Sequence, residues 1–294
     1  MISKLDINVF IDSTNNVNKK FLFLAIIYFF IYPWFGIERW RRLVLKNYPL
    51  KYKTASQIYF LGEGINLILP SKLGDLSKSY FLKKHKICPI SYANGTVIYE
   101  KFLDIVSILI IFLLSWIFNE QVLQTSIRLI TLFVFVFLMA TFVMFNLHFL
   151  ENKFSKFIPD KYDFIIKHLI GFFNYFKMIK TDYLSIIFFL GFSLLFWVGH
   201  FFQVYLFIQA ANIDIGFFQV TYFMPLIIIL SLFPFTVAGF GTRELSLLFF
   251  LSEVSTNENI ILSSLLISLR YLIPGIVGLI IYLLFEKKHK QKAC

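Results

Sequence analysis

The chain has 294 residues, of which 58% are hydrophobic and 20% aromatic, and its mean hydropathy is +0.74. A soluble domain of this length cannot hide so much apolar surface, because its folded surface must carry more charge. The net charge of +11 therefore indicates Lys and Arg in cytoplasmic loops of a membrane protein, rather than a nucleic-acid partner. The apolar stretches lack the two-residue alternation of a β-barrel, so they predict an all-α, polytopic integral membrane bundle.

Five apolar stretches reach or approach the length that crosses the roughly 30 Å of a membrane's hydrocarbon core. These predicted spans are residues 21–37, 91–118, 126–150, 183–210 and 260–285. The first is expected to be a retained span rather than a signal peptide, because bulky Trp34 and Trp40 stand where a small-residue cleavage site would lie. Residues 1–20 are then a polar N-terminal tail, and residues 1–294 form one transmembrane domain.

The distribution of positive charge predicts the orientation of the spans. Residues 38–53 carry six Lys and Arg, residues 71–86 five, residues 151–182 six and the tail, 286–294, four. We expect these segments on the cytoplasmic side of the inner membrane. The connections without Lys or Arg are expected outside, together with the N-terminus, and they are residues 119–125, 211–216 and 252–259.

Two apolar regions, 55–70 and 217–251, have both flanks on the same predicted side, so neither crosses the membrane. Each is interrupted by Gly and Pro, and irregular backbone at membrane depth is tolerated only where protein or a water-filled cavity surrounds it. We therefore predict two opposed re-entrant hairpins in an inverted-repeat-like bundle, a pattern that points to a transporter site. The alternative is that both regions are kinked helices. The predicted hinge residues are Pro70, Gly74, Pro234, Gly239 and Gly241.

The basic segment 151–182 alternates Lys with apolar residues, which is typical of an interfacial helix on anionic lipid. Cys88 and Cys294 fall on the predicted cytoplasmic side, so both are expected to be free thiols. The five His are scattered and offer no metal cluster, and no cofactor is expected.

The first polar motif runs from Asn66 to Asp75 and includes Pro70, Lys72 and Gly74. Pro and Gly end a helix here, and a carboxylate then favours the positive N-terminal end of the next helix. A helix stop followed by a cap explains this motif well except for Asn66, which lies inside an apolar run.

The second motif, Glu100, Lys101 and Asp104, lies in the first half of a predicted span. Glu100 and Asp104 share a helix face, and Lys101 is three residues before Asp104 and able to pair with it. Ionisable residues within a membrane are costly and mark functional sites. The alternative is a structural ion pair near the cytoplasmic interface.

The third motif combines Gly241, Arg243 and Glu244 with Arg270 in the last predicted span. A buried Arg needs a partner, and Glu244 is one candidate. Alternatively, Arg243 and Arg270 form an anion site with their planar guanidinium groups. The membrane-depth cations and carboxylates are expected to balance, which favours their pairing with one another.

Together the motifs predict a polar substrate site at the membrane midplane, with no catalytic residue assigned. Its candidate residues are Asn66, Lys72, Asp75, Glu100, Lys101, Asp104, Arg243, Glu244 and Arg270.

In their order along residues 20–286, these motifs resemble the flippase-like family whose best-known member domain is the membrane part of lysylphosphatidylglycerol synthase. The residues that carry the resemblance are Arg39-Trp40, Asn66, Pro70, Gly74, Asp75, Glu100, Lys101, Asp104, Pro234, Gly239, Gly241, Arg243, Glu244 and Arg270. Lys72 and Lys101 replace Arg of the family pattern, and Asp75 replaces Glu. Family members usually carry another span before the Arg-Trp span, whereas residues 1–20 are polar here.

The resemblance implies translocation of a lipid, such as a phospholipid or a polyprenyl-linked glycolipid, and membrane lipids with an anionic head group are the expected partners. It also implies a membrane role beside glycosyl transfer, so two alternatives stay open. A membrane-embedded transferase is disfavoured because the outside loops are short and no Asp-x-Asp metal motif occurs. A noncatalytic subunit of glycolipid or polysaccharide assembly, with a membrane partner subunit or glycosyltransferase, is not excluded by the sequence.

Overall fold

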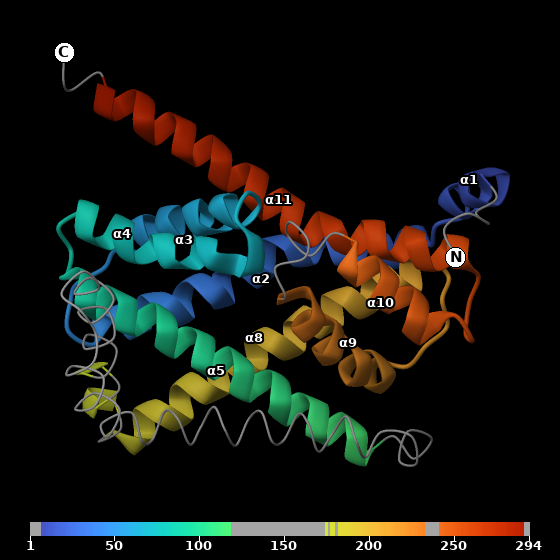
Figure 1. Cartoon of the computed structure of the whole chain (residues 1–294), viewed down its shortest axis with the longest axis horizontal. Helices are drawn as coiled ribbons and strands as arrows, with labels where there is room; N and C mark the ends of the chain where they lie inside the picture. Colours follow the sequence, from blue (N-terminus) through green and yellow to red (C-terminus); the bar gives the residue numbers. More distant parts are fainter. Residues whose placement is uncertain (1–6, 119–173, 176, 180–181, 233–240, 291–294) are drawn as a thin grey trace, which may run out of the picture.

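The computed structural model describes residues 7–118, 174, 175, 177–179, 182–232 and 241–290, without the side chains of 70–72, 232 and 285–290. Every regular element among them is helical, as the sequence predicts (Figure 1). The elements are α1 (Ile7–Asn15), α2 (Lys19–Leu45), α3 (Tyr52–Asn66), the 3₁₀ helix η2 (Pro70–Leu76), α4 (Ser77–Lys84), α5 (Ile90–Ile117), α8 (Tyr183–Ala210), α9 (Phe217–Leu232), α10 (Thr242–Leu251) and α11 (Asn257–Lys290).

Three of the described helices, α2, α8 and α11, are long and apolar enough to cross a membrane. Their exposed side chains are largely apolar, as lipid requires: Phe30 of α2 is 83% exposed and Leu184 of α8 is 82% exposed. Helix α5 is as long as α8 but carries Glu100, Lys101 and Asp104. The predicted span 126–150 and most of the basic segment 151–182 lie outside the described residues.

The predicted boundaries differ from the observed ones mainly at α2, which continues eight residues beyond residue 37 to Leu45. Charged residues therefore extend this helix instead of closing it. Glu38 accepts hydrogen bonds from Arg41 and Arg42, each with one nitrogen–oxygen distance of 2.7 Å. Such pairs three and four residues apart stabilise a helix. The N-terminal segment also differs, because residues 7–15 of the expected polar tail form α1.

Two helical hairpins lie between long helices in the order of elements along the chain. In the first, α3 packs against η2 and α4, and in the second, α9 packs against α10. Each hairpin begins and ends at the same end of the molecule, and the two enter from opposite ends (Figure 1). Their inner ends meet, since η2 contacts α9. This is the arrangement expected for two opposed re-entrant hairpins.

The chain repeats one order of elements, a long helix, a hairpin and a second long helix. The first unit is α2, α3–α4 and α5, and the second is α8, α9–α10 and α11. The first helices of the two units, α2 and α8, pack together, and each hairpin packs on the last helix of the other unit: α3 on α11, and α9 on α5. Small residues, Gly64 of α3 and Gly278 of α11, lie where α3 and α11 approach each other.

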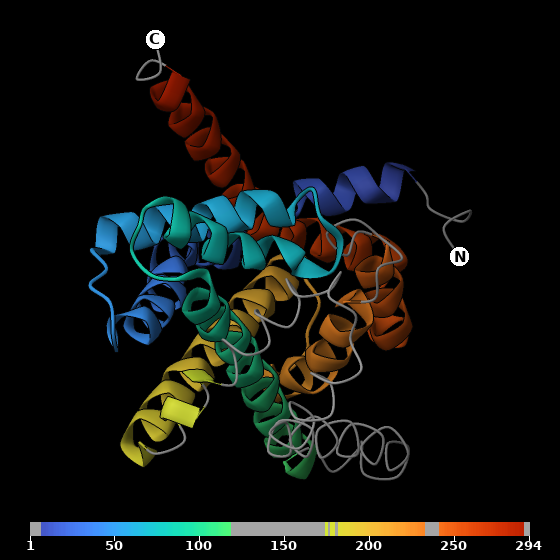
Figure 2. The ribbon, with the colours of Figure 1, turned by 60° about the vertical axis from the view of Figure 1, so that its left-hand side comes forward.

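The units are held together by two main groups of buried apolar side chains. The larger group joins α5, α8, α9, α10 and α11, and Phe112, Phe207 and Leu247 within it are fully buried. The smaller group lies beneath the first hairpin, where Trp40 of α2, Ile58 of α3 and Leu82 of α4 are fully buried. The C-terminal end of α11 extends away from the other helices in both views (Figures 1 and 2).

Candidate functional site

A cavity lies where the first hairpin meets α2, α5, α8 and α11. The volume that the centres of water molecules can occupy in this cavity is about 60 Å³. The cavity therefore has space for a few waters. Its walls carry ionisable side chains of both signs among the described residues. The cations are Arg39, Lys78, Lys101 and Arg270, and the carboxylates are Glu63, Asp75, Glu100 and Asp104.

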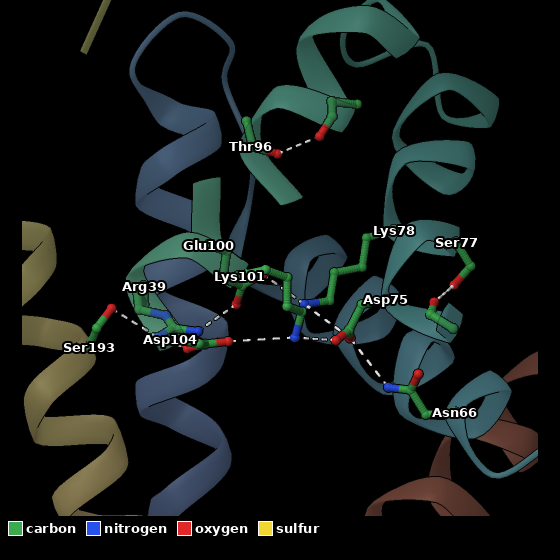
Figure 3. Close-up of polar contacts among 12 residues, drawn as sticks. Arg39, Asn66, Asp75, Ser77, Lys78, Thr96, Glu100, Lys101, Asp104 and Ser193 are labelled. Carbon is green, nitrogen blue, oxygen red and sulfur yellow. Dashed lines mark hydrogen bonds and ion pairs between the residues drawn. The ribbon is translucent and has the colours of Figure 1, made fainter. Parts of the chain in front are cut away.

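Arg39 of α2 is central to this cluster (Figure 3). Its Nη1 donates to Asp104 Oδ1 at 2.6 Å and to Ser193 Oγ at 2.9 Å, and its Nη2 donates to Glu100 Oε1 at 2.9 Å. Because Glu100 and Asp104 are one turn apart on the same face of α5, one guanidinium group reaches both. Charge-assisted bonds of this kind are strong and directional, so Arg39 fixes α2 against α5 and α8.

Lys78 of α4 pairs with the other oxygen of Glu100, with Nζ 2.9 Å from Oε2. The same Nζ lies 3.5 Å from Asp75 Oδ1 and faces the rings of Trp40 and Tyr59. Lys78 is almost completely buried. A lysine so far from water is retained as a cation only when carboxylates compensate it, and two carboxylates do so here.

Lys101 of α5 pairs with Asp75 Oδ2 and lies 3.5 Å from Asp104 Oδ2. Its side chain is 39% exposed, whereas both carboxylates are buried. Asn66 Nδ2 donates to Asp75 Oδ1 at 3.3 Å. The hairpin and α5 are thus joined through Asp75, whose carboxylate is held by two lysines and an amide.

These contacts close into a ring of alternating charges, which we call the charge ring. It runs from Asp75 to Lys78, Glu100, Arg39, Asp104, Lys101 and back to Asp75. Three cations and three carboxylates balance within it, as buried charges must. The sequence motifs singled out Asp75, Glu100, Lys101 and Asp104, and the structure brings all four into the charge ring.

Helix α8 supplies a wall of the cavity that the sequence did not single out as functional. Trp197 Nε1 donates to Asp104 Oδ1 at 2.9 Å, Ser193 bonds Arg39, and His200 also lines the cavity. Their spacing of four and three residues places them on one face of α8. That spacing was the available signal, but neutral residues at such spacing ordinarily serve packing.

Arg270 of α11 lines the cavity away from the charge ring. Its Nη1 donates to Gln203 Oε1, and its guanidinium lies 3.5 Å from the centre of the Tyr32 ring. Gln203 in turn donates from Nε2 to the backbone oxygen of Ala25 at 3.0 Å. Both described partners of Arg270 are neutral, in contrast to those of Arg39, Lys78 and Lys101.

Arg243 and Glu244 lie on α10, and neither is among the described residues that line the cavity. Arg243 Nη2 donates to Ser268 Oγ at 2.7 Å, and its guanidinium lies 4.9 Å from the centre of the Tyr271 ring. Glu244 accepts a hydrogen bond from Ser264 Oγ at 2.8 Å and lies 3.4 Å from Arg243. These contacts attach the second hairpin to α11.

Glu244 also caps its own helix, since its carboxylate accepts a hydrogen bond from the Gly241 backbone nitrogen. Gly241 has φ of 92°, a left-handed conformation that residues other than Gly rarely adopt. This predicted hinge glycine therefore directs the chain into α10. Pro234 and Gly239, the other predicted hinges of this hairpin, lie outside the described residues.

The hinge residues of the first hairpin, Pro70 and Gly74, lie within η2. Pro70 is its first residue, and Lys72 lies within it with a side chain outside the described part of the structure. A Cβ on Gly74 would overlap the backbone of Asn66. Only a glycine here lets the turn close onto the end of α3 and bring Asp75 beside Asn66.

Sequence reasoning left three cavity charges out of the site. Arg39 belongs only to the Arg-Trp pair, and Glu63 and Lys78 belong to none of the polar motifs. Glu63 and Lys78 each have a weak local signal, because Lys78 follows Asp75 by three residues and Glu63 precedes Asn66 by three. A helical reading of the segments around the break would have placed each pair on one face.

The described residues contain no group of three or more His, Cys, Asp or Glu that is arranged to hold a metal ion. Cys88, between α4 and α5, is a free buried thiol, and burial raises its pKa to about 11. A thiol with this pKa is almost fully protonated at neutral pH and is therefore a poor nucleophile.

One of three comparisons with known proteins gives a match. The family described as the lysylphosphatidylglycerol synthase TM region matches residues 1–278, a stretch that contains the whole charge ring and Arg270. Neither the curated proteins nor the solved structures give a match. With its apolar helices and with most of its length matched, the chain is a membrane protein that belongs to the family of the lysylphosphatidylglycerol synthase TM region.

Proposed function

We propose that this protein is a translocator that moves a phosphate-bearing lipid, a phospholipid or a polyprenyl-linked glycolipid, across the inner membrane. The observation that supports this most is the charged cavity at the meeting point of the first hairpin with the long helices. A polar chamber inside an apolar bundle gives a head group a place between the two leaflets, which the bilayer itself does not.

The chemistry of the cavity suits the phosphate group of such a lipid. Arg270 presents a planar guanidinium, the group that binds phosphate with two parallel hydrogen bonds. Its described partners, Gln203 and the Tyr32 ring, are neutral. A phosphate therefore reaches Arg270 without displacing a carboxylate, whereas Arg39 is already bonded to Glu100 and Asp104.

The two hairpins supply the moving parts that translocation requires. They enter from opposite ends, their inner ends meet beside the cavity, and each packs on the last long helix of the other unit (Figure 1). We propose that one hairpin opens the cavity to the cytoplasm and the other opens it to the outside, as broken helices do in transporters built from inverted repeats.

The proposal is tested in proteoliposomes that contain a lipid with a fluorescent label at the end of one acyl chain. The labelled chain end folds back to the membrane surface, where a reductant in solution can reach it. A membrane-impermeant reductant quenches only label in the outer leaflet, so quenching of the inner-leaflet label reports translocation. We expect vesicles with protein to lose the protected fraction and empty vesicles to keep it. The control is a vesicle with an unrelated helical membrane protein at equal density, which should keep the protected fraction.

If vesicles with and without the protein keep the same protected fraction for every phosphate-bearing lipid, translocation by the isolated protein is wrong. That result would favour a noncatalytic role in glycolipid or polysaccharide assembly, in which a membrane partner subunit is required.

A further inference from the structure

The charge ring leaves one cation and one carboxylate of the cavity outside it. These are Arg270 of α11 and Glu63 of α3, which both line the same cavity. The ring itself is balanced, so the charge balance of the remaining space depends on these two residues. Their chemistry therefore indicates what kind of head group fits.

Arg270 and Glu63 both interact with one tyrosine, Tyr32. The Arg270 guanidinium lies 3.5 Å from the centre of the Tyr32 ring. Glu63 interacts electrostatically with Tyr32 and with the neighbouring Tyr59. Tyr32 belongs to α2, Tyr59 and Glu63 to α3, and Arg270 to α11. Opposite charges from two different helices thus line one cavity together with Tyr32.

The described side chains of the cavity sum to zero charge, because its four cations match its four carboxylates. A bound head group with a net charge would leave that charge uncompensated inside the apolar bundle, where ions are poorly solvated. A head group that carries one charge of each sign leaves the sum at zero. It also offers an ion-pair partner to a cation and to a carboxylate at once.

We infer that the head group accepted by this cavity is net neutral and zwitterionic, with its phosphate bound by Arg270 and its ammonium group bound by Glu63. The inference rests on the proposed translocation and names the chemical class of the substrate. It replaces the anionic head group that the family resemblance implied, because Arg270 shares the cavity with the carboxylate of Glu63. It also disfavours a net-cationic lipid such as lysylphosphatidylglycerol.

The experiment compares three acyl-labelled lipids in the proteoliposome assay: zwitterionic phosphatidylethanolamine, anionic phosphatidylglycerol and net-cationic lysylphosphatidylglycerol. We expect phosphatidylethanolamine to cross faster than either charged lipid by about tenfold or more, the loss expected when one charge-assisted hydrogen bond is not formed.

Two isosteric variants test the two halves of the site. Glu63→Gln removes the proposed ammonium partner and should move the preference toward phosphatidylglycerol. Arg270→Gln removes the proposed phosphate partner and should move the preference toward lysylphosphatidylglycerol. Matched controls remove one charge from exposed positions outside the cavity: Glu253→Gln and Lys53→Gln. Both controls should keep the wild-type order of the three lipids.

Folding is checked for each variant by size-exclusion chromatography and thermal unfolding in detergent. If Arg270→Gln does not fold, Arg270→Lys keeps the charge and is expected to keep the wild-type order at a lower rate. If Glu63→Gln does not fold, Glu63→Asp keeps the negative charge and is expected to keep the wild-type order at a lower rate. The order of preference among three lipids does not change when a mutation only lowers the amount of folded protein.

The results separate the inference from the proposed function. If phosphatidylglycerol or lysylphosphatidylglycerol crosses as fast as phosphatidylethanolamine, or if Glu63→Gln leaves the order unchanged, the zwitterion assignment is wrong while translocation stands. If none of the three lipids crosses, the proposed translocation of phospholipids fails and the assignment fails with it.

Discussion

The first hairpin brings Glu63, Asp75 and Lys78 to the cavity, whereas the described residues of the second hairpin supply no charge there. Arg243 and Glu244 of the second hairpin instead bond to serines of α11. Both hairpins have the same place in the order of elements, and each packs on the last long helix of the other unit. A repeated architecture therefore does not imply repeated chemistry, and the charges of the two hairpins serve different purposes.

Asp75 and Glu244 show the difference most directly, since each follows a glycine near the start of the second helix of its hairpin. Glu244 caps α10 through the Gly241 backbone nitrogen. Helix α4 begins after Leu76, whose side chain makes no capping bond, and the Asp75 carboxylate pairs with Lys78 and Lys101. The same local pattern is a helix cap in one hairpin and a cavity carboxylate in the other.

The largest effect is expected from thiol labelling that tests whether the two hairpins enter from opposite faces. Single cysteines at the exposed positions Lys51 and Lys86 flank the first hairpin, and those at Asp214 and Glu253 flank the second. In a protein without Cys88 and Cys294, an impermeant thiol reagent should label the second pair in whole cells and the first pair only after permeabilisation. Opposite results within a pair would mean that the hairpin crosses the membrane.

The next largest effect is expected from Arg39→Gln, because it leaves Glu100 and Asp104 buried without their shared cation. Breaking a buried ion pair in this way costs about 3–5 kcal/mol. Arg42→Gln is the control, because Arg42 is 46% exposed, pairs with Glu38 and faces the rings of Phe188 and Phe192. An exposed ion pair contributes about 0–1 kcal/mol. Thermal unfolding in detergent should show a large decrease only for Arg39→Gln. Equal unfolding midpoints would show that the charge ring does not stabilise the fold.

Arg270 and Arg243 provide a direct comparison of the two regions. Arg270→Lys keeps the charge but loses the planar fork, so lipid movement per folded protein should fall about tenfold, the effect of one charge-assisted hydrogen bond. Arg243→Lys should reduce the unfolding midpoint through the lost contact with Ser268 and leave the rate per folded protein near wild type. If Arg270→Lys is silent in both measurements, Arg270 is not a substrate residue.

The smallest effect is expected from the partly exposed ion pair between the end of α2 and the start of α8. Lys46 donates to Asp182 at 2.8 Å, and the hydrogen bonds from Lys46 and Ser185 hold the pKa of Asp182 below its ordinary value. The native state then favours the ionised form, so the pair stabilises the fold above the unfolded pKa of about 3.9. Its contribution is lost only as the pH falls through the lower native pKa.

Asp182→Asn should therefore cause a small decrease in the midpoint of thermal unfolding in detergent. This decrease should have the same size at every pH between about 5 and 8. A decrease that grows toward pH 8 would indicate that another titrating group is involved. A decrease as large as that of Arg39→Gln would contradict the distinction between exposed and buried ion pairs.

The sequence predicted the helical elements well where composition alone decides them. Helix α8 has the predicted bounds, and the Gly- and Pro-interrupted region 217–251 contains a hairpin, because long apolar runs and helix-breaking residues act locally. The hairpin predicted over 55–70 covers mainly one arm, α3. The returning arm is α4, which lies within the segment 71–86 that was expected as a cytoplasmic connection, and its Lys78 is buried. The end of α2 was predicted eight residues too early, because Glu38 and its Arg partners continue the helix beyond residue 37.

The candidate site was predicted only in part. Asn66, Asp75, Glu100, Lys101, Asp104 and Arg270 do line one cavity. Arg39 and Lys78 were not included, because a basic residue near a predicted span end is ordinarily a topology signal. Arg243 and Glu244 were included, because a charged pair in an apolar region points to function until its neighbours are known.

By itself, the sequence determined that this is a helical membrane protein, which segments are long helices and where the chain breaks, since these depend on hydropathy and on residues acting over a few positions. Only the tertiary structure decided which charges meet. Arg39 and Asp104 are 65 residues apart in the chain, and no local pattern records that distance. The partners of a buried charge are selected by the packing of helices, because the energetic requirement for compensation acts on spatial neighbours and not on neighbours in sequence.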